Sequence, residues 1–274
     1  MKKEVLKNKL KIYLEFAVIL VFIVMILWII FGFTQKDSVS SCGDGTSFSE
    51  CSSNKPYFCD SDGVLKEKAS VCGCPSILLE KEDFCYSPYQ QSPKDTILKY
   101  TLDSKEKEIE FISYKGISDY LKNLKTTIFY NHDQTPQLSD FKIRHINESL
   151  QREMLLPLVI KIQSLAPDDK IEQARIAISL IQNINYGYSN KTTLFAGKQI
   201  NYSRYPYDVL YDEEGICGEK SELLVFLLKE LGFGTAIIFY ADENHEAVGI
   251  KCPAEESLNN SGYCYIETTA PSII

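Results

Sequence analysis

Cys217, His245 and Glu267 follow one another near the end of the chain and have the residue types that thiol catalysis needs. In such a site a thiolate attacks, an imidazole takes up and returns the proton, and an acid orients the imidazole. Cys217 stands in the segment GICGEKS, directly before the apolar run ELLVFLL. We therefore expect Cys217 in the first turn of a buried helix, where unpaired amide groups and the helix dipole stabilise a thiolate.

One helix and three strands must position these side chains. The helix is expected over residues 217–231, and Gly232 follows as a favourable residue for ending it. The β-branched run at 235–240 predicts a strand, and His245 opens a second that continues to Cys252. A third strand is expected over 262–268. Strands packed on the helix would bring His245 to the thiol and the acid to the imidazole.

The register of the last two strands decides whether His245 and Glu267 can meet. If Cys252 and Cys264 face each other in a regular hairpin, Glu267 opposes Gly249. That position is four residues from His245, or about 13 Å away at roughly 3.3 Å per residue. Side-chain alternation nevertheless places His245 and Glu267 on one face of the sheet. We therefore predict a β-bulge, or a disulfide formed from the loop, that restores the contact.

The nine cysteines predict disulfides and leave one thiol over. Two, Cys252 and Cys264, bracket a loop near the C-terminus, and six fall in a short stretch before the main domain. Even groups of this kind are typical of exported proteins. The cysteine left over is Cys217, for which the alternative is an inert buried thiol. The six, whose pairing the sequence leaves open, are Cys42, Cys51, Cys59, Cys72, Cys74 and Cys85.

Residues 16–33 form an unbroken apolar run of 18 residues, which is long enough to cross a bilayer. Five lysines precede the run, so the N-terminus is expected in the cytoplasm. A cleaved signal peptide is the alternative, but the run is longer than such peptides have and lacks a small-residue cleavage site. We expect a basic cytoplasmic tail at 1–11, a transmembrane signal anchor at 12–34, and an extracellular remainder.

Residues 35–90 predict a small cysteine-rich module with a linker, and residues 91–274 predict a larger domain. The module has few apolar residues and needs covalent cross-links. Zinc is the alternative to disulfides, but the Cys72-Gly73-Cys74 spacing is too short and no second pair is near. The chain has 37 acidic and 29 basic residues, a balance that disfavours nucleic acid and tolerates cationic partners.

Between the module and Cys217 the periodicity predicts further elements. Helices are expected at 118–130, at 146–165 with an interruption at Pro157, and at 171–185. A strand is expected at 107–114, a loop at 131–141 and an irregular connection at 186–212. His132 and His145 are interpreted as solvated residues without a catalytic role.

Several segments together resemble the transglutaminase-like superfamily, over roughly residues 100–274. The segments are ARIAISL at 174–180, YPYDVL at 205–210, GICGEKS at 215–221, NHEAVG at 244–249 and IETT at 266–269. The match is closest to membrane-anchored archaeal members, and the module resembles cysteine-rich modules that lie beside the membrane in exported archaeal proteins. The resemblance implies an α+β, papain-like core with a cysteine-bearing buried helix on an antiparallel sheet.

The same resemblance implies a catalytic triad of Cys217, His245 and Glu267. Glu267 departs from the usual Asp by one methylene, and the Trp that often follows the His is replaced by Glu246-Ala247. An aromatic residue often forms part of the oxyanion site of this superfamily, and its candidates here are Tyr205, Tyr207 and Tyr211.

Two classes of function follow from these observations. The first is a cell-surface cysteine enzyme acting on amide bonds of a peptide or protein, as a peptidase, an amidase or a transglutaminase-type acyl transferase. The second is a catalytically inactive ectodomain that binds proteins or the cell envelope. Asp212, Glu213 and Glu214 precede Cys217, and their charge would disfavour a thiolate. A metal held by Cys217 and His245 lacks a third ligand, so neither metal nor cofactor is expected.

Overall fold

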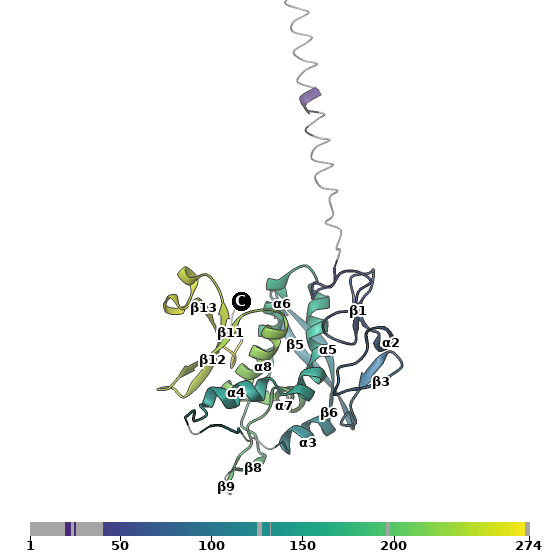
Figure 1. Ribbon diagram of the computed structural model, residues 1–274. Helices are drawn as coiled ribbons and strands as arrows, with labels where there is room; N and C mark the ends of the chain where they lie inside the picture. Colours follow the sequence, from purple (N-terminus) through teal and green to yellow (C-terminus); the bar gives the residue numbers. More distant parts are fainter. Residues whose placement is uncertain are drawn as a thin grey trace, which may run out of the picture. The chain divides into compact units, whose positions relative to one another are not determined.

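The computed structural model describes residues 20–22, 25, 41–124, 128–131, 133–195 and 198–271 (Figure 1). The chain divides into two units, Met1–Ser40 and Ser41–Ile274. The predicted membrane span lies outside the described residues, apart from 20–22 and 25, which are helical. Among the described residues no helix has the length and apolar character needed to cross a bilayer.

The unit Ser41–Ile274 has an α+β structure, in which helices pack against several small sheets. Its described helices are α2 (Ala69–Cys72), α3 (Lys115–Lys122), α4 (Leu138–Ile146), α5 (Ser149–Leu165), α6 (Lys170–Asn183), α7 (Pro206–Asp212) and α8 (Cys217–Glu230), with short 3-10 turns η1 (Ala254–Glu256) and η2 (Leu258–Asn260). Its described strands are β1 (Tyr57–Cys59), β2 (Leu65–Glu67), β3 (Leu79–Lys81), β4 (Phe84–Tyr86), β5 (Pro93–Leu102), β6 (Lys105–Tyr114), β7 (Asn185–Tyr186), β8 (Thr192–Phe195), β9 (Lys198–Asn201), β10 (Glu214–Gly215), β11 (Thr235–Tyr240), β12 (His245–Lys251) and β13 (Tyr263–Ile266).

Helix α8 is the buried helix predicted from the sequence. Its residues 223–228 are all buried, because apolar side chains surround the helix on every side. At its start the Glu219 carboxylate accepts a hydrogen bond from the backbone N–H of Ile216 at 3.1 Å. At its end Gly232 adopts a φ of 93°, a conformation that glycine reaches without steric cost. The predicted bounds of this helix are therefore confirmed to within a residue.

The three predicted C-terminal strands form one antiparallel sheet in the order β11–β12–β13. Helix α8 packs against β12 and β11, as the ribbon shows (Figure 1). Ala247 and Val248, in the middle of β12, are completely buried. The central strand is thus fixed by a partner strand on each side and by the helix beneath it.

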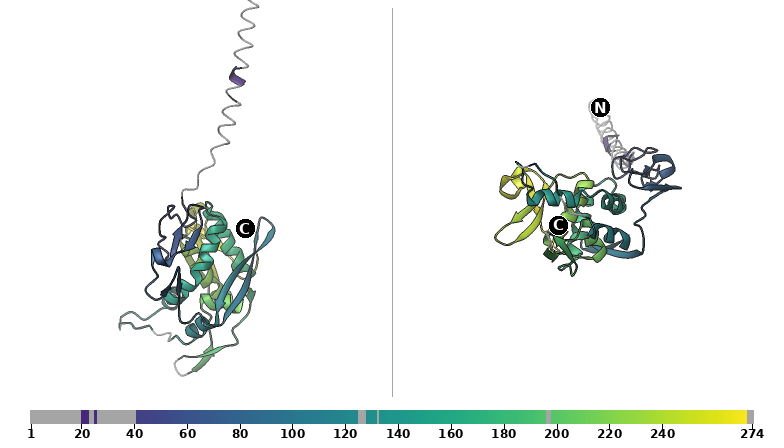
Figure 2. Two further views of the ribbon diagram at one scale, coloured as in Figure 1. Left: turned by 90° about the vertical axis from the view of Figure 1, so that its right-hand side faces the viewer. Right: turned by 60° about the horizontal axis from the view of Figure 1, so that its bottom comes forward.

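A long hairpin, β5–β6, packs beside α6 on another side of the unit (Figure 2). Its side chains alternate between buried and exposed, so the predicted strand at 107–114 is confirmed and extends back to Lys105. The neighbouring α5 continues through Pro157, where the sequence predicted an interruption. Buried side chains on both sides of the proline, including Leu155, Leu156 and Leu158, hold the helix in place despite the missing N–H.

Three further expectations differ from the structure. Helix α3 starts at Lys115 and ends at Lys122, earlier than the predicted 118–130. Helix α4 begins at Leu138, inside the predicted loop, with the Asp140 carboxylate accepting a hydrogen bond from the Gln137 N–H at 2.7 Å. The stretch 186–212, predicted as irregular, contains the β8–β9 hairpin and α7. Helix α7 is short and is fixed by the burial of Tyr207, Val209 and Leu210, a tertiary effect that the local pattern does not show.

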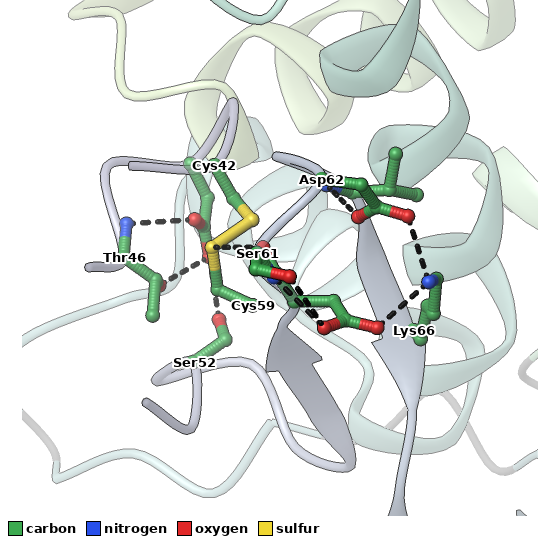
Figure 3. The surroundings of a disulfide bond; sticks show 10 residues. Cys42, Thr46, Ser52, Cys59, Ser61, Asp62 and Lys66 are labelled. Carbon is green, nitrogen blue, oxygen red and sulfur yellow. Dashed lines mark hydrogen bonds and ion pairs between the residues drawn. A yellow bond between two sulfur atoms is a disulfide. The ribbon is translucent and has the colours of Figure 1, made fainter. Parts of the chain in front are cut away.

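The cysteine-rich segment is held by three disulfides, Cys42–Cys59, Cys51–Cys72 and Cys74–Cys85, so the disulfide prediction is confirmed. Beside the first bridge, Thr46 and Ser52 each donate a hydrogen bond to the Asp44 carboxylate, at 2.9 and 2.6 Å (Figure 3). These bonds stabilise a loop that has little apolar core of its own.

The cysteine-rich segment packs directly on the helices of the larger domain. Ile160 of α5 belongs to the same buried cluster as Cys42 and Cys59. The carbonyl of Gly43 accepts hydrogen bonds from Gln173 and Lys170, at 3.1 and 3.0 Å. The two segments of Ser41–Ile274 are therefore in extensive contact within one compact unit.

Candidate active site

His245 and Glu267 are brought together by a hydrogen bond. His245 is the first residue of β12, and Glu267 follows directly after β13. The imidazole Nε2 lies 2.9 Å from Oε2 of Glu267. Both side chains remain partly accessible, with exposed fractions of 28% and 25%. The bond through Nε2 leaves the second ring nitrogen, Nδ1, as the one available to a nucleophile.

The register of β12 and β13 explains how this contact forms. Ile250 pairs with Cys264, so Glu267 lies opposite Ala247, two residues from His245 on the same face of the sheet. In the predicted regular hairpin Cys264 would pair with Cys252, whereas in the structure it pairs with Ile250, so the register is shifted by two residues. Cys252 lies beyond the end of β12, and its disulfide reaches diagonally to Cys264. The predicted disulfide formed from the loop is confirmed, and the strand pairing remains regular.

The Glu267 carboxylate accepts hydrogen bonds at both oxygens. Oε1 accepts from the backbone N–H of Thr268 and from the N–H and hydroxyl of Thr269, at 2.9, 2.8 and 2.6 Å. Oε2 accepts from the Tyr265 hydroxyl at 2.7 Å, in addition to its contact with His245. Partial burial opposes ionisation, but the bonds from Thr269, Tyr265 and His245 outweigh it and lower the pKa of Glu267 to about 2. The acid is therefore a fixed carboxylate.

Two tyrosines flank the His245–Glu267 pair. The ring of Tyr240, on β11, stacks on the imidazole with centroids 6.4 Å apart. Tyr240 also meets Tyr265 edge to face at 6.2 Å. Burial and the bond to the Glu267 carboxylate raise the pKa of Tyr265, so its hydroxyl stays protonated and remains a donor. The pair thus lies beside two aromatic residues of its own sheet that also contact each other.

Cys217 is the first residue of α8 and is the free cysteine, while the other eight form disulfides. Its side chain is half-buried, which excludes both a bridged and a fully enclosed thiol. Strand β10 precedes it and pairs in parallel with β7, which places Tyr186 opposite Gly215. Burial, Tyr188 and the nearby Cys217 raise the pKa of Tyr186. In the part of the chain described, the Cys217 thiol forms no hydrogen bond with His245.

The first turns of α8 nevertheless lie against the strands that carry His245 and Glu267. The Ser221 hydroxyl donates to the backbone carbonyl of Glu246 at 3.3 Å and lies 3.3 Å from the Thr268 hydroxyl. A Cβ on Gly218 would lie only 3.0 Å from Oε2 of Glu246. A glycine after Cys217 therefore allows close approach of the helix start to the residue that follows His245.

Lys220 is a buried cation one turn below Cys217 on α8. Its ammonium donates to the carbonyl of Ile184, where α6 ends, at 2.7 Å. Burial lowers the pKa of Lys220 to about 8, and the charge of Glu267 partly opposes this. The side chain therefore ties α8 to the end of α6 and contributes positive charge beneath the site.

Each of the acidic residues before Cys217 forms an ion pair with a basic side chain. Asp212 pairs with Lys191 and Arg204, Glu213 pairs with Lys94, and Glu214 pairs with Arg204, at 2.5 to 3.1 Å. Arg204 is almost completely buried and also contacts Glu219 at 3.1 Å. Arg204 lies 8 to 15 residues from these partners, and its role was missed because the sequence pattern does not show which acids it contacts.

His145 is not a solvated residue, as the sequence had suggested, while His132 lies outside the described residues. The Nδ1 of His145 lies 2.6 Å from Glu222 of α8, and its ring stacks on Tyr205 with centroids 3.6 Å apart. Lys142 bridges Glu222 and Glu246, at 2.9 and 2.8 Å. Burial would raise the pKa of Glu222, but the bond with His145 and the charge of Lys142 lower it. Helix α4, predicted as a loop, therefore joins α8 to β12.

The predicted oxyanion candidates have other contacts. Tyr207 is completely buried, and its hydroxyl accepts a hydrogen bond from the Tyr114 N–H at 2.6 Å. Tyr205 stacks on His145, and Tyr211 lies beneath the Lys94 ammonium, 5.4 Å from it.

Comparison of the chain with protein-family models, curated proteins and solved structures finds no match. Among the described residues no group of three His, Cys, Asp or Glu side chains could hold a metal ion. The described geometry provides a free, half-buried thiol at the start of α8 and, on the sheet against which that helix packs, an imidazole oriented by a carboxylate.

Proposed function

We propose that this protein is a cell-surface cysteine enzyme that acts on amide bonds through Cys217, His245 and Glu267. The reaction is hydrolysis, or transfer of the acyl group to a second amine. In this proposal α8 and the β11–β13 sheet form a papain-like core of the transglutaminase type, and the substrate is a peptide or protein.

The observation that carries the proposal is the hydrogen bond between His245 and Glu267 beside the helix that begins with Cys217. The pairing occurs although the acid is a Glu, because Thr269 and Tyr265 fix the longer side chain. The free state of Cys217 adds support, since the other eight cysteines of the chain form disulfides. A general base reaches its partner at about 2.6–3.2 Å, and in ligand-free enzymes this contact is often longer.

The proposed chemistry proceeds through a thioester. The imidazole takes the proton of Cys217, and the thiolate attacks the carbonyl carbon of the amide. The carbon–nitrogen bond breaks, and the imidazolium gives its proton to the departing amine. Water or a second amine then attacks the thioester, loses its proton to the imidazole, and Sγ leaves and recovers that proton. Unpaired amide groups in the first turn of α8 are suited to the carbonyl oxygen as it becomes negative.

We further propose that residues 12–34 anchor the chain in the cell membrane, with residues 1–11 in the cytoplasm and the catalytic unit outside. Support comes from the apolar run and preceding lysines in the sequence. The four disulfides are typical of an oxidising compartment.

The test is selective alkylation of the full chain in detergent micelles, under non-reducing conditions. Iodoacetamide should modify Cys217 at neutral pH faster than a small free thiol, and Cys217→Ala should remove the label. His245→Ala should slow the labelling of Cys217 at least tenfold, because it removes the base. His145→Ala is the matched control, since it removes the other structured imidazole. Equal labelling rates in all proteins that retain Cys217 would exclude the enzyme.

A catalytically inactive, binding ectodomain is the second candidate. The specific observation in its favour is that Cys217 and His245 form no hydrogen bond in the described structure. This candidate predicts that Cys217 reacts no faster than an ordinary thiol. It also predicts that Cys217→Ala leaves binding to protein or envelope partners intact.

A further inference from the structure

The third residue of the proposed triad shares one of its oxygens between two donors. Oε2 of Glu267 accepts from the Tyr265 hydroxyl at 2.7 Å and contacts Nε2 of His245 at 2.9 Å. The other oxygen is occupied by Thr268 and Thr269. Because an ionised carboxylate accepts several hydrogen bonds, each donor restricts where the group can turn.

A glutamate needs more of this restriction than an aspartate, because it has one additional rotatable bond. Bonds at Oε1 alone would still let Oε2 swing away from the imidazole. The Tyr265 hydroxyl prevents this movement, because it donates a hydrogen bond to Oε2 of Glu267, the oxygen that contacts the imidazole. Tyr265 also contacts Tyr240, whose ring stacks on the imidazole.

We propose that Tyr265 is a positioning residue of the candidate site, which holds Oε2 of Glu267 on the imidazole of His245. This inference rests on the proposed function and adds a fourth residue to its machinery. Tyr265 acts through Glu267 and has no contact of its own with the reacting atoms.

Other charged or titratable groups face this pair and must stay constant in a test. From α8 this is Lys220, whose pKa responds to the charge of Glu267, and from β11 it is Tyr240. Glu246 and its partner Lys142 lie on the opposite face of β12 from His245. Phenylalanine at position 265 leaves all of them in place and removes only the hydroxyl.

The test is a double-mutant cycle on the alkylation rate of Cys217, in the full chain, with iodoacetamide as probe. The four proteins are wild type, Tyr265→Phe, Glu267→Gln and the double variant. Tyr265→Phe should slow labelling roughly three- to tenfold, as expected for loss of one coupled polar contact. In the Glu267→Gln background the same change should have almost no effect, because the group it positions is altered. Tyr263→Phe, on the same face of β13, is the matched control and should label like wild type.

A second readout does not depend on reactivity. In a carboxyl-carbon NMR titration, Tyr265→Phe should raise the pKa of Glu267, since one stabilising donor is lost. Equal losses of labelling in both backgrounds, or an unchanged Glu267 titration, would overturn the role of Tyr265. If no protein labels at Cys217, the enzyme proposal fails, while the titration still decides whether Tyr265 holds Glu267.

Discussion

Replacing Glu267 by glutamine should reduce stability in a way that depends on pH. The folded structure lowers the pKa of Glu267 from an ordinary 4.5 to about 2. At about 1.4 kcal/mol per pKa unit this corresponds to roughly 3 kcal/mol of preference for the carboxylate. Solvent reaches a quarter of the side chain, so screening reduces the value to about 1–2 kcal/mol. Because the folded pKa is the lower one, this stability is present above about pH 4.5 and is lost as the pH falls toward 2.

The assay is urea unfolding of the disulfide-bonded unit Ser41–Ile274 at several pH values from 7 down to 2.5. Glu267→Gln should be less stable than wild type by about 1–2 kcal/mol at pH 7, and the two proteins should converge at the acidic end. Glu255→Gln, at an exposed position in η1, is the matched control and should match wild type throughout. A constant difference between Glu267→Gln and wild type across the range would refute the reasoning, because it would not involve ionisation.

Three further changes test other parts of the fold by the same unfolding assay. For Lys220→Met, the free energy of unfolding relative to wild type should fall by about 2–3 kcal/mol from pH 7 to pH 10. The cause is that wild type becomes more stable over this range, because the folded pKa of Lys220 is lowered and its buried ammonium deprotonates. The same difference between the two proteins at both pH values would contradict this. Gly43→Ala should cost about 1–3 kcal/mol, because its Cβ would lie 2.5 Å from the Gln163 carbonyl oxygen, and an unchanged midpoint would disprove close docking of the module. Joint replacement of Cys252 and Cys264 by serine should cost about 3 kcal/mol and slow alkylation of the free thiol, whereas unchanged alkylation would show that the bridge does not set the register.

The sequence could predict the helices and strands that have a clear hydrophobic pattern of their own. The apolar run after Cys217 required a buried helix, and the alternation at 107–114 required a strand. Helix α4 could not be predicted, because its residues are mainly polar and its stability depends on Lys142 and His145 contacting another helix. The continuation of α5 through Pro157 could not be predicted for a similar reason. The burial of the neighbouring side chains outweighs the tendency of proline to interrupt a helix.

The candidate site was predictable in its members but not in its geometry. The parity of β12 and β13 put His245 and Glu267 on one face, but parity is the same for two registers that differ by two residues. Which of the two registers forms depends on whether Cys252 belongs to the strand or to the loop after it, and the sequence pattern does not show where the strand ends. Tyr265 was missed although side-chain alternation places it on the same face as Glu267, two residues further along the chain. Arg204 was missed because its contact with Asp212 depends on how the chain turns between them.

The position of Cys42 determines which part of the protein would bear a mechanical load. Cys42 is bridged to Cys59, and the next residue, Gly43, is hydrogen-bonded to α6. A pull on the chain at residue 41 would therefore pass into the bridged loop and the helices behind it. The same helix also reaches the candidate site, because the Gln182 side-chain amide of α6 donates to the backbone carbonyl of Glu267 at 2.9 Å. A force applied at residue 41 would therefore be carried by α6 toward the segment that holds Glu267.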